Sequence, residues 1–388
     1  MKYVDEFRDP QLAKQLIAKI AADAQKLEKP LHFMEICGGH THTIYRYGLE
    51  NLLPENVGFV HGPGCPVCVI PMGRIDDALW LAAQPGVILT TFGDMMRVPG
   101  STGQSLLQAR AQGADVRFVY SPLDALTIAE ENPDKHVVYF AVGFETTAPS
   151  TCVTLKAAAA KHVENFSIFS NHVTIQPPLR AIVNEEGTVV DGFIGPGHVA
   201  TIVGTQAFEF LPAEYNLPVV VAGFEPLDIL QSVAMLVEQF VSGDVAAGRA
   251  RVENQYARVV VPEGNPAALA LMEETFTLRD EFEWRGLGWL PHSGYAIADA
   301  YAQWDAEKRF TVPGKRVADP PACECGAVLS GHIKPWQCAV FGTKCTPDNP
   351  VGTCMVSPEG ACAAYYNFGR IDRELTATIA RTAAQAQA

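Results

Sequence analysis

The chain has 388 residues, a formal net charge of −14 and 48% hydrophobic residues. That length is enough for two or three domains with sizeable cores. The acidic balance, without any Lys/Arg run, argues against nucleic-acid binding. No apolar run reaches the ~18–20 residues of a membrane span, and the start "MKYVDEFRDP" lacks the apolar stretch of a signal peptide. We therefore expect a cytoplasmic protein that does not bind membranes.

The first predicted element is a helix over residues 9–28, with Asp9 as N-cap and Pro10 at its first position. Short apolar, β-rich runs then alternate with helical stretches up to residue 256, which is typical of parallel sheets covered on both faces. The expected strands are 31–37, 57–62, 86–92, 116–121, 136–145, 166–172, 190–197 and 217–225. The expected helices are 71–84, 102–112, 147–162, 177–184, 198–207 and 226–242.

This alternation predicts an α/β fold of two similar Rossmann-like, parallel-sheet lobes. The C-terminal region differs, because a helical stretch is followed there by Gly-, Pro- and Cys-rich sequence with too little regular structure to hold itself without a cofactor or bridges. The expected division is an N-terminal helix packing on the body (1–30), lobe 1 (31–121), lobe 2 (122–256) and an irregular C-terminal domain (257–388) with helices at 264–276 and 370–384.

Polar motifs follow the ends of most predicted strands. They are "CGGHTH", "GPGCPVC", "FGDMMR", "GFETT", "SNH" and "GPGH". Two strands end in the same tripeptide, Gly-Phe-Glu, at residues 143–145 and 223–225. Ligands of open α/β sheets bind beyond the carboxyl ends of the strands. We therefore expect these motifs to share one cleft.

Ten cysteines are many for a protein of the reducing cytosol, where clustered cysteines more often bind metal or do redox chemistry than form disulfides. Six crowd the last quarter: Cys323, Cys325, Cys338, Cys345, Cys354 and Cys362. Their spacing lacks the paired knuckles of zinc sites and the compact ferredoxin run. Spread thiolates in Gly/Pro-rich loops favour an iron–sulfur cluster, with zinc or no metal as the alternatives.

The motif "GPGCPVC" places Cys65 and Cys68 in a tight turn after a strand, with Cys68 close to the expected start of a helix. A helix N-terminus stabilises a thiolate, so the pair suits a redox dithiol in which one thiolate attacks and the other resolves. The alternative is two small residues in a tight loop.

The motif "MEICGGHTH" places Cys37 beside His40 and His42. One thiolate with nearby imidazoles suits a soft or borderline metal, including iron. A Cys/His nucleophilic pair is the alternative.

Other strand ends carry Glu145, His172 and His198, with Thr146 and Thr147 expected to cap a helix. Each is individually typical of a hydrogen-bonded loop residue, and only their shared placement points to a site. The sequence has no G-x-x-x-x-G-K-[ST] motif to support nucleotide binding. Cys152 lies in an apolar helical stretch and is expected in the core.

Five motifs, "CGGHTH", "GPGCPVC", "GFETT", "GPGHV" and "CTPDNPVGTCMVSPEGAC", occur in this order over essentially the whole chain. In this combination the sequence resembles the HypD family of [NiFe]-hydrogenase maturation factors. The resemblance implies two similar α/β lobes and a third domain that carries a [4Fe–4S] cluster. It also implies pairing with the small chaperone HypC and the holding of iron on which the Fe(CN)2(CO) unit is built. HypE would deliver the cyanide, and the completed unit would pass to the hydrogenase large subunit.

Carried over by motif, the resemblance makes Cys37 the iron-holding thiolate, shared with a cysteine of HypC, with His40 as its neighbour. It makes Cys65 and Cys68 the redox pair beside that iron. The cleft would be lined by Glu145, Thr146, Thr147 and His198. The fourth motif departs mildly from the family in having Ala200 where serine is expected.

For the cluster, the family-like spacing C-x14-C-x6-C-x16-C selects Cys323, Cys338, Cys345 and Cys362. Cys325 and Cys354 would then form a second dithiol between the cluster and the cleft. The spacing by itself equally allows either of these two as a ligand.

The leading hypothesis is thus an assembly scaffold with redox capacity, a monomer on its own, rather than an enzyme that turns over a free substrate. One alternative is a free-standing [4Fe–4S]/dithiol oxidoreductase of the ferredoxin–thioredoxin-reductase type, and another is a zinc-stapled small-molecule enzyme. The Cys37 motif favours the scaffold, because a pure dithiol relay needs no third cysteine flanked by histidines.

Overall fold

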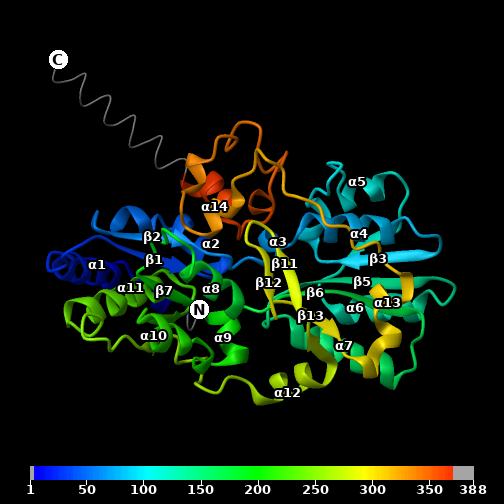
Figure 1. Ribbon diagram of the computed structural model, residues 1–388, viewed down its shortest axis with the longest axis horizontal. Coiled ribbons are helices and arrows are strands. Elements are labelled where there is room, and N and C mark those ends of the chain that lie inside the picture. The colour runs from blue at the N-terminus through cyan, green and yellow to red at the C-terminus, as the bar shows by residue number, and fades with distance from the viewer. Residues whose placement is uncertain (1–3, 370–388) are drawn as a thin grey trace.

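The computed structural model describes residues 4–369, so the helix predicted at 370–384 lies outside the described residues. Two parallel sheets lie side by side, and the cysteine-rich C-terminal module sits over their junction (Figure 1). This confirms the predicted α/β class with two Rossmann-like lobes and an irregular C-terminal region. No helix among residues 4–369 is long and apolar enough to cross a membrane.

Sheet A has five parallel strands in the order β2-β1-β7-β8-β9. Their bounds are β1 Leu31–Glu35, β2 Val57–His61, β7 Gly192–Pro196, β8 Val219–Ala222 and β9 Val252–Asn254. Sheet B has four parallel strands in the order β4-β3-β5-β6. Their bounds are β3 Val87–Thr91, β4 Val116–Phe118, β5 His136–Gly143 and β6 Phe166–His172.

The two sheets do not follow the contiguous ranges expected for the lobes. The chain leaves sheet A after β2, builds all of sheet B, and returns to sheet A at β7. Residues 31–121 and 122–256 therefore each contribute strands to both sheets. Strands of a buried parallel sheet are apolar along their whole length, so their sequences do not reveal which strands are neighbours.

Helices cover both sheets, and α1 packs along α11 (Figure 1). The α-helices up to the third module are α1 Pro10–Ala24, α2 Gly38–Arg46, α3 Pro66–Val69, α4 Met72–Ala82, α5 Leu106–Ala111, α6 Pro122–Glu131, α7 Ala148–Ala160, α8 Gln176–Val183, α9 Gly197–Val203, α10 Phe210–Tyr215 and α11 Pro226–Val241. As predicted, Asp9 caps α1, accepting from the Gln11 and Leu12 amides at 2.7 and 3.2 Å.

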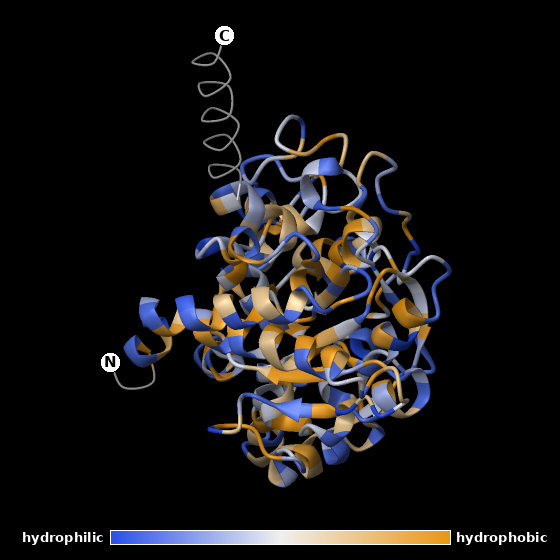
Figure 2. Ribbon diagram, turned by 90° about the vertical axis from the view of Figure 1, so that its left-hand side faces the viewer, coloured by the Kyte–Doolittle hydropathy of each residue, from blue (hydrophilic) through white to orange (hydrophobic). Residues whose placement is uncertain are grey.

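Hydrophobic residues are concentrated in the interior of the ribbon, and many hydrophilic residues lie at its periphery (Figure 2). Phe33 of β1 and Phe59 of β2 are register partners, and both are completely buried. Burying one such side chain stabilises the fold by about 1.5–3 kcal/mol. Cys152 is completely buried in α7, as expected for a core residue.

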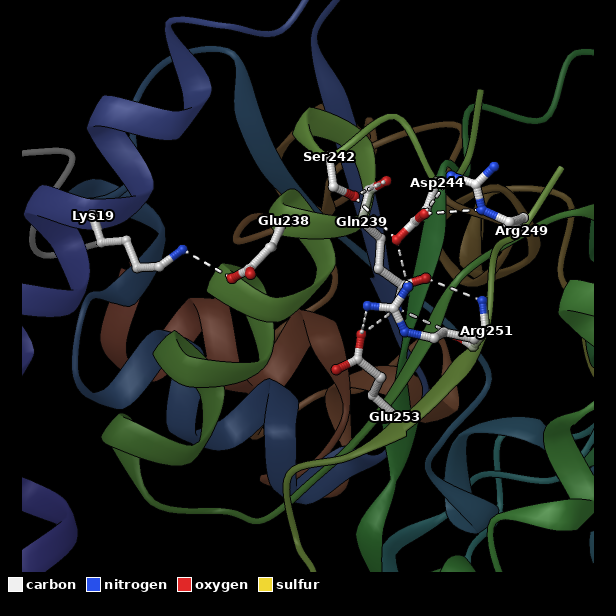
Figure 3. Close-up of polar contacts among 8 residues, drawn as sticks. All are labelled: Lys19, Glu238, Gln239, Ser242, Asp244, Arg249, Arg251 and Glu253. Atoms are coloured by element: carbon white, nitrogen blue, oxygen red, sulfur yellow. Dashed lines mark hydrogen bonds and ion pairs between the residues drawn. The ribbon is translucent and has the colours of Figure 1, made fainter. Parts of the chain in front are cut away.

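The outer edge of sheet A is fixed by polar contacts between β9 and the end of α11 (Figure 3). The Gln239 side chain accepts from the Arg251 amide at 3.0 Å and donates to the Arg251 carbonyl at 3.3 Å, as a neighbouring strand would. Asp244 accepts from both Arg249 and Arg251, each at 2.7 Å. The Arg251 carbonyl also accepts from the Val219 amide of β8 at 3.2 Å, so Gln239 holds the residue before β9 beside its neighbouring strand.

The third module consists of short helices and strands that pack against both lobes. Its elements are α12 Pro266–Thr275, β10 Phe276–Leu278, β11 Glu281–Trp284, β12 Gly288–Pro291, β13 Tyr295–Ile297, α13 Ala306–Phe310, α14 Cys325–Leu329 and α15 Ala361–Ala364. The short 3-10 or π turns of the described chain are η1 Asp5–Arg8, η2 Leu49–Leu52, η3 Gly93–Arg97, η4 Gln206–Phe208, η5 Asp299–Trp304, η6 Pro335–Gln337, η7 Thr353–Met355 and η8 Tyr365–Gly369.

Candidate functional site: a chain of buried thiols at the sheet ends

Cys37 lies two residues after β1 and is the N-cap residue of α2, with 7% of its surface exposed. The "GPGCPVC" loop lies against it: the Gly38 amide donates to the Gly64 carbonyl at 3.2 Å, and a Cβ on Gly64 would be 2.2 Å from the Cys37 nitrogen. Only glycine at 64 permits this approach. Burial raises the pKa of the Cys37 thiol, and the backbone amide of Gly39 opposes that rise.

Behind Cys37 lies a buried hydrogen-bond network centred on Glu35. One carboxylate oxygen accepts from the Cys37 amide at 3.1 Å, and the other accepts from Thr41 and from His61 Nδ1, the latter at 2.7 Å. The Tyr45 hydroxyl donates to His61 Nε2 at 2.6 Å. The network holds the backbone of the Cys37 turn to β1 and β2.

Two predicted site histidines meet through a phenylalanine. His40 and His198 both stack on the ring of Phe224, with centroids 4.8 and 3.8 Å away. Cys37, His198 and Phe224 follow the adjacent strands β1, β7 and β8, so parallel pairing brings them to one edge.

His40 is completely buried, and burial lowers its pKa to about 4. Its Nε2 donates to the Ala222 carbonyl at 3.2 Å, so the neutral ring carries its proton there. Its Nδ1 has no hydrogen-bond partner among the described residues. A lone pair in this state can accept a proton donor or bind a metal.

Cys65 is the N-cap residue of α3, and Cys68 lies within that helix. The thiol of Cys68 interacts with those of Cys65 and Cys354, and both interactions raise its pKa. Cys354 in turn contacts Cys325, whose sulfur lies 3.1 Å from that of Cys323. Five thiols thus form a continuous path, Cys65–Cys68–Cys354–Cys325–Cys323, between the "GPGCPVC" loop and the third module.

Within this path, the thiols of Cys325 and Cys68 lower the pKa of Cys354 to about 6 by hydrogen bonding. Burial raises the pKa of Cys68 well above that of an ordinary thiol. The thiol of Cys354 is therefore the one most readily converted to a thiolate, the reactive form in disulfide exchange.

At the far end of the path is a small cavity of the third module. The cysteines that line it are Cys323, Cys325, Cys338, Cys345 and Cys362. These include all four residues that the family resemblance assigns to the cluster. Cys354 is not among the lining residues.

The donor set of this cavity fits an iron–sulfur cluster, because soft thiolates approach from several directions. Gly352 adds to the fit: a Cβ there would lie 2.3 Å from the Cys323 sulfur and 2.6 Å from that of Cys325. Within residues 4–369, no three His, Cys, Asp or Glu side chains converge closely enough to hold a single metal ion.

The segment 353–360 connects the thiol path to both lobes. The Thr353 hydroxyl donates to the Cys68 carbonyl at 2.5 Å, and the Ser357 hydroxyl donates to Asp94 of sheet B's η3 turn at 2.8 Å. Arg97 donates to the Val356 carbonyl at 2.6 Å. On the side of sheet A, Nδ1 of His42 in α2 lies 3.4 Å from the Pro358 carbonyl oxygen.

The remaining predicted site residues lie at the ends of sheet B strands. Glu145 is buried and accepts from the Ile175 amide at 3.0 Å rather than from a residue of the Cys37–His40 turn. His172 is buried and pairs with the Thr151 hydroxyl at 2.9 Å. Thr146 is half-buried at the same turn. Thr147 occupies the N-cap position of α7, but its hydroxyl donates back to the Phe144 carbonyl and does not accept from a helix amide.

Comparison with known proteins identifies the family. Residues 11–369 match the family model HypD, described as "Hydrogenase formation hypA family". The chain belongs to the HypD family. It is 55% identical to the hydrogenase maturation factor HypD of Rhizobium leguminosarum bv. viciae, over 99% of this chain and all of that protein. The HypD proteins of Azotobacter vinelandii and Escherichia coli K12 are 52% and 50% identical, over 98% and 96% of this chain and all of each relative.

Sequence reasoning missed Phe224 and the Glu35–His61 pair. Phe224 had a signal, since it is the centre of the repeated Gly-Phe-Glu tripeptide. Glu35 and His61 had none, because each lies inside an expected apolar strand, and only the pairing of β1 with β2 places them together.

Proposed function

We propose that this HypD family member is the scaffold on which, with a HypC-like chaperone, iron receives its cyanide and carbon monoxide ligands before delivery to the hydrogenase large subunit. The observation that carries the proposal is the thiol path that joins the cysteine-lined cavity to the loop packed against Cys37. A HypE-like protein is the proposed cyanide donor, and the proposed compartment is the cytoplasm.

In this proposal the iron is cargo. Cys37 would hold it together with a cysteine of the partner, and the free Nδ1 of His40 lies in the same turn to contact the iron or one of its ligands. Phe224 keeps both histidine rings at this edge. The Glu35 network orients the Cys37 backbone while leaving its thiol free for the metal.

Cys323, Cys338, Cys345 and Cys362 would hold a [4Fe–4S] cluster, with Cys325 at the corner where the thiol path begins. Such a cluster supplies electrons one at a time. The two dithiols, Cys325/Cys354 and Cys65/Cys68, are in contact with each other, which is what thiol–disulfide exchange requires.

A thiol oxidoreductase without cargo iron would have the same path but no use for the Cys37 turn. The test is anaerobic co-purification of Cys37→Ala with the HypC-like partner, with Cys152→Ala as the matched control because that thiol is buried in α7 away from the path. We expect Cys37→Ala to lose the infrared bands of diatomic ligands and the cargo iron while keeping iron–sulfur absorbance. Bands retained in this variant would refute the role of Cys37, and a colourless wild-type protein with about one zinc would refute the cluster.

A further inference from the structure

Arg285 is a buried arginine whose guanidinium is incompletely paired. It lies in the turn between β11 and β12 and is 1% exposed. Its Nε forms an ion pair with Asp319 at 3.0 Å. Its two terminal nitrogens, Nη1 and Nη2, have no hydrogen-bond partner among the described residues. Burying a charged group without hydrogen-bond partners costs considerable free energy. We therefore expect a hydrogen-bond acceptor to pair with the two terminal nitrogens of Arg285.

The turn that carries Arg285 lies between α3, which contains Cys68, and α14, which begins at Cys325 (Figure 1). On one side, the Arg285 amide donates to the Val69 carbonyl at 2.8 Å, one residue beyond Cys68 in α3. On the other side, Gly286 packs so tightly on α14 that a Cβ there would be 2.5 Å from the Gly326 Cα. Gly286 also has a φ of +78°, a second reason for glycine at this position.

The sulfurs of Cys323 and Cys325 lie within electrostatic reach of this guanidinium. The turn lies directly against the start of α14, because a Cβ on Gly286 would be 3.6 Å from the Cys325 carbonyl carbon. The Cys325 thiol and burial raise the pKa of the Cys323 thiol, and the Arg285 charge opposes that rise. At Cys325, the Cys323 thiol lowers the pKa, Cys354 and burial raise it, and the Arg285 charge lowers it. Asp319 is the one acidic partner of Arg285 in the described structure, and a third of its side chain is exposed. The positive charge is therefore compensated from its solvent side only.

We propose that Arg285 is the counter-charge and N–H donor for anionic sulfur at the Cys323–Cys325 corner of the cavity, either a thiolate or a cluster-bound sulfur. This inference rests on the proposed redox function of the cavity and adds a residue to it. Arg285 is a positioning residue, because it acts on the sulfurs and not on the cargo. Its charge stabilises the more negative, reduced form, so it raises the reduction potential of the centre at this corner.

The test measures reduction potentials of the full-length protein isolated anaerobically, without HypC-like partner or cargo iron. Arg285→Met keeps the length of the side chain and removes the charge, and Arg285→Lys keeps the charge and loses the fork. We expect the Met variant to show a lower cluster potential by about 60 mV, a tenfold change for a one-electron couple. The Lys variant should recover most of that shift.

Asp319→Asn is a second variant that should keep the fold. Its amide oxygen can still accept from the Gly286 amide, as the Asp319 carboxylate does at 3.1 Å. It frees the guanidinium from its competing anion, so the potential should move upward. Arg316→Met is the control, since that arginine belongs to the same module but is exposed and pairs with Glu281. An unchanged potential in both Arg285→Met and Asp319→Asn would overturn the proposal.

The cavity thiols distinguish this proposal from the proposed function. If the isolated protein holds no cluster, the cluster role fails, but Arg285 still predicts slower alkylation of Cys323 and Cys325 in Arg285→Met, because fewer thiolates form. Equal alkylation rates in the wild type and Arg285→Met would then overturn the Arg285 proposal. A severalfold loss restricted to these two thiols would support it.

Discussion

The thiols of Cys68 and Cys354 interact so that the pKa of Cys68 is raised and that of Cys354 is lowered, although the two residues are far apart in the chain. This interaction joins the segment that follows β2 of sheet A to the C-terminal module. Because Cys354 also interacts with Cys325, it is the thiol through which the Cys325/Cys354 pair meets the Cys65/Cys68 pair. We therefore expect thiol–disulfide exchange between the two pairs to pass through Cys354.

Mild oxidation is expected to trap this shared position. Treatment of the protein with about one equivalent of diamide should link Cys354 to Cys68 or to Cys325, because the thiolate of Cys354 forms most easily and has both partners in contact. Peptide mapping by mass spectrometry after alkylation measures the links. Cys152 serves as internal control and should stay fully reduced. Oxidation that reaches Cys152 before Cys354 would contradict the thiol path.

Adding one methyl group at Gly352 should damage the cavity. The residue has an ordinary extended backbone, with φ −115° and ψ 155°, so Gly352→Ala meets no backbone strain. The new Cβ would instead collide with the sulfurs of Cys323 and Cys325. We expect severalfold lower iron and sulfide content per chain after anaerobic reconstitution, with helical circular dichroism retained.

The control for that variant is Gly93→Ala, because a Cβ at Gly93 has open space around it. Gly93→Ala should reconstitute like the wild type. Equal iron and sulfide content in the two alanine variants would show that the sulfurs at Gly352 are free to move aside.

Glu145 should make stability depend on pH. Burial raises the pKa of its carboxyl to about 7 from an ordinary value of 4.5. Since the folded state holds the proton more tightly, the Glu145 contribution to the free energy of unfolding is constant below pH 4.5 and falls as pH rises to about 7. The full loss is about 3 kcal/mol, at 1.36 kcal/mol per pKa unit.

Glu145→Gln removes this titration and keeps an oxygen for the Ile175 amide. The stability of the variant relative to the wild type should therefore increase between pH 4.5 and 7, as measured by urea unfolding across that range. Glu164→Gln, at an exposed position, is the matched control and should change little. A constant difference between Glu145→Gln and wild type would refute the buried, protonated carboxyl.

Phe224 should control the environment of His198. Burial lowers the pKa of His198, and the stacked Phe224 ring contributes to that burial. Phe224→Ala should raise this pKa toward its ordinary value, which NMR titration of the imidazole can follow. His136, whose pKa is lowered to about 4 by burial in lobe B, is the control and should not move. An unchanged pKa of His198 in Phe224→Ala would mean that groups other than Phe224 bury the imidazole.

Much of the local structure was predictable. The strand expected at 166–172 is β6 without change, and the helix expected at 226–242 is α11 less one residue. The α2 helix was missed, because its sequence, GGHTHTIYR, begins with two glycines and has few strong helix formers. Tertiary contacts explain why it forms: α2 packs on α11 and α15, and Phe224 and Glu359 fill the space over its two glycines.

The sequence by itself determined the parallel α/β class, the placement of polar motifs at strand ends, and the clustering of six cysteines in the last quarter of the chain. These follow from local periodicity and residue type, which are properties of short segments. The tertiary structure decided which strands are neighbours, that Cys354 lies near Cys68, and that Arg285 is buried between α3 and α14. Such contacts join segments far apart in the chain, and they depend on packing that no local pattern encodes.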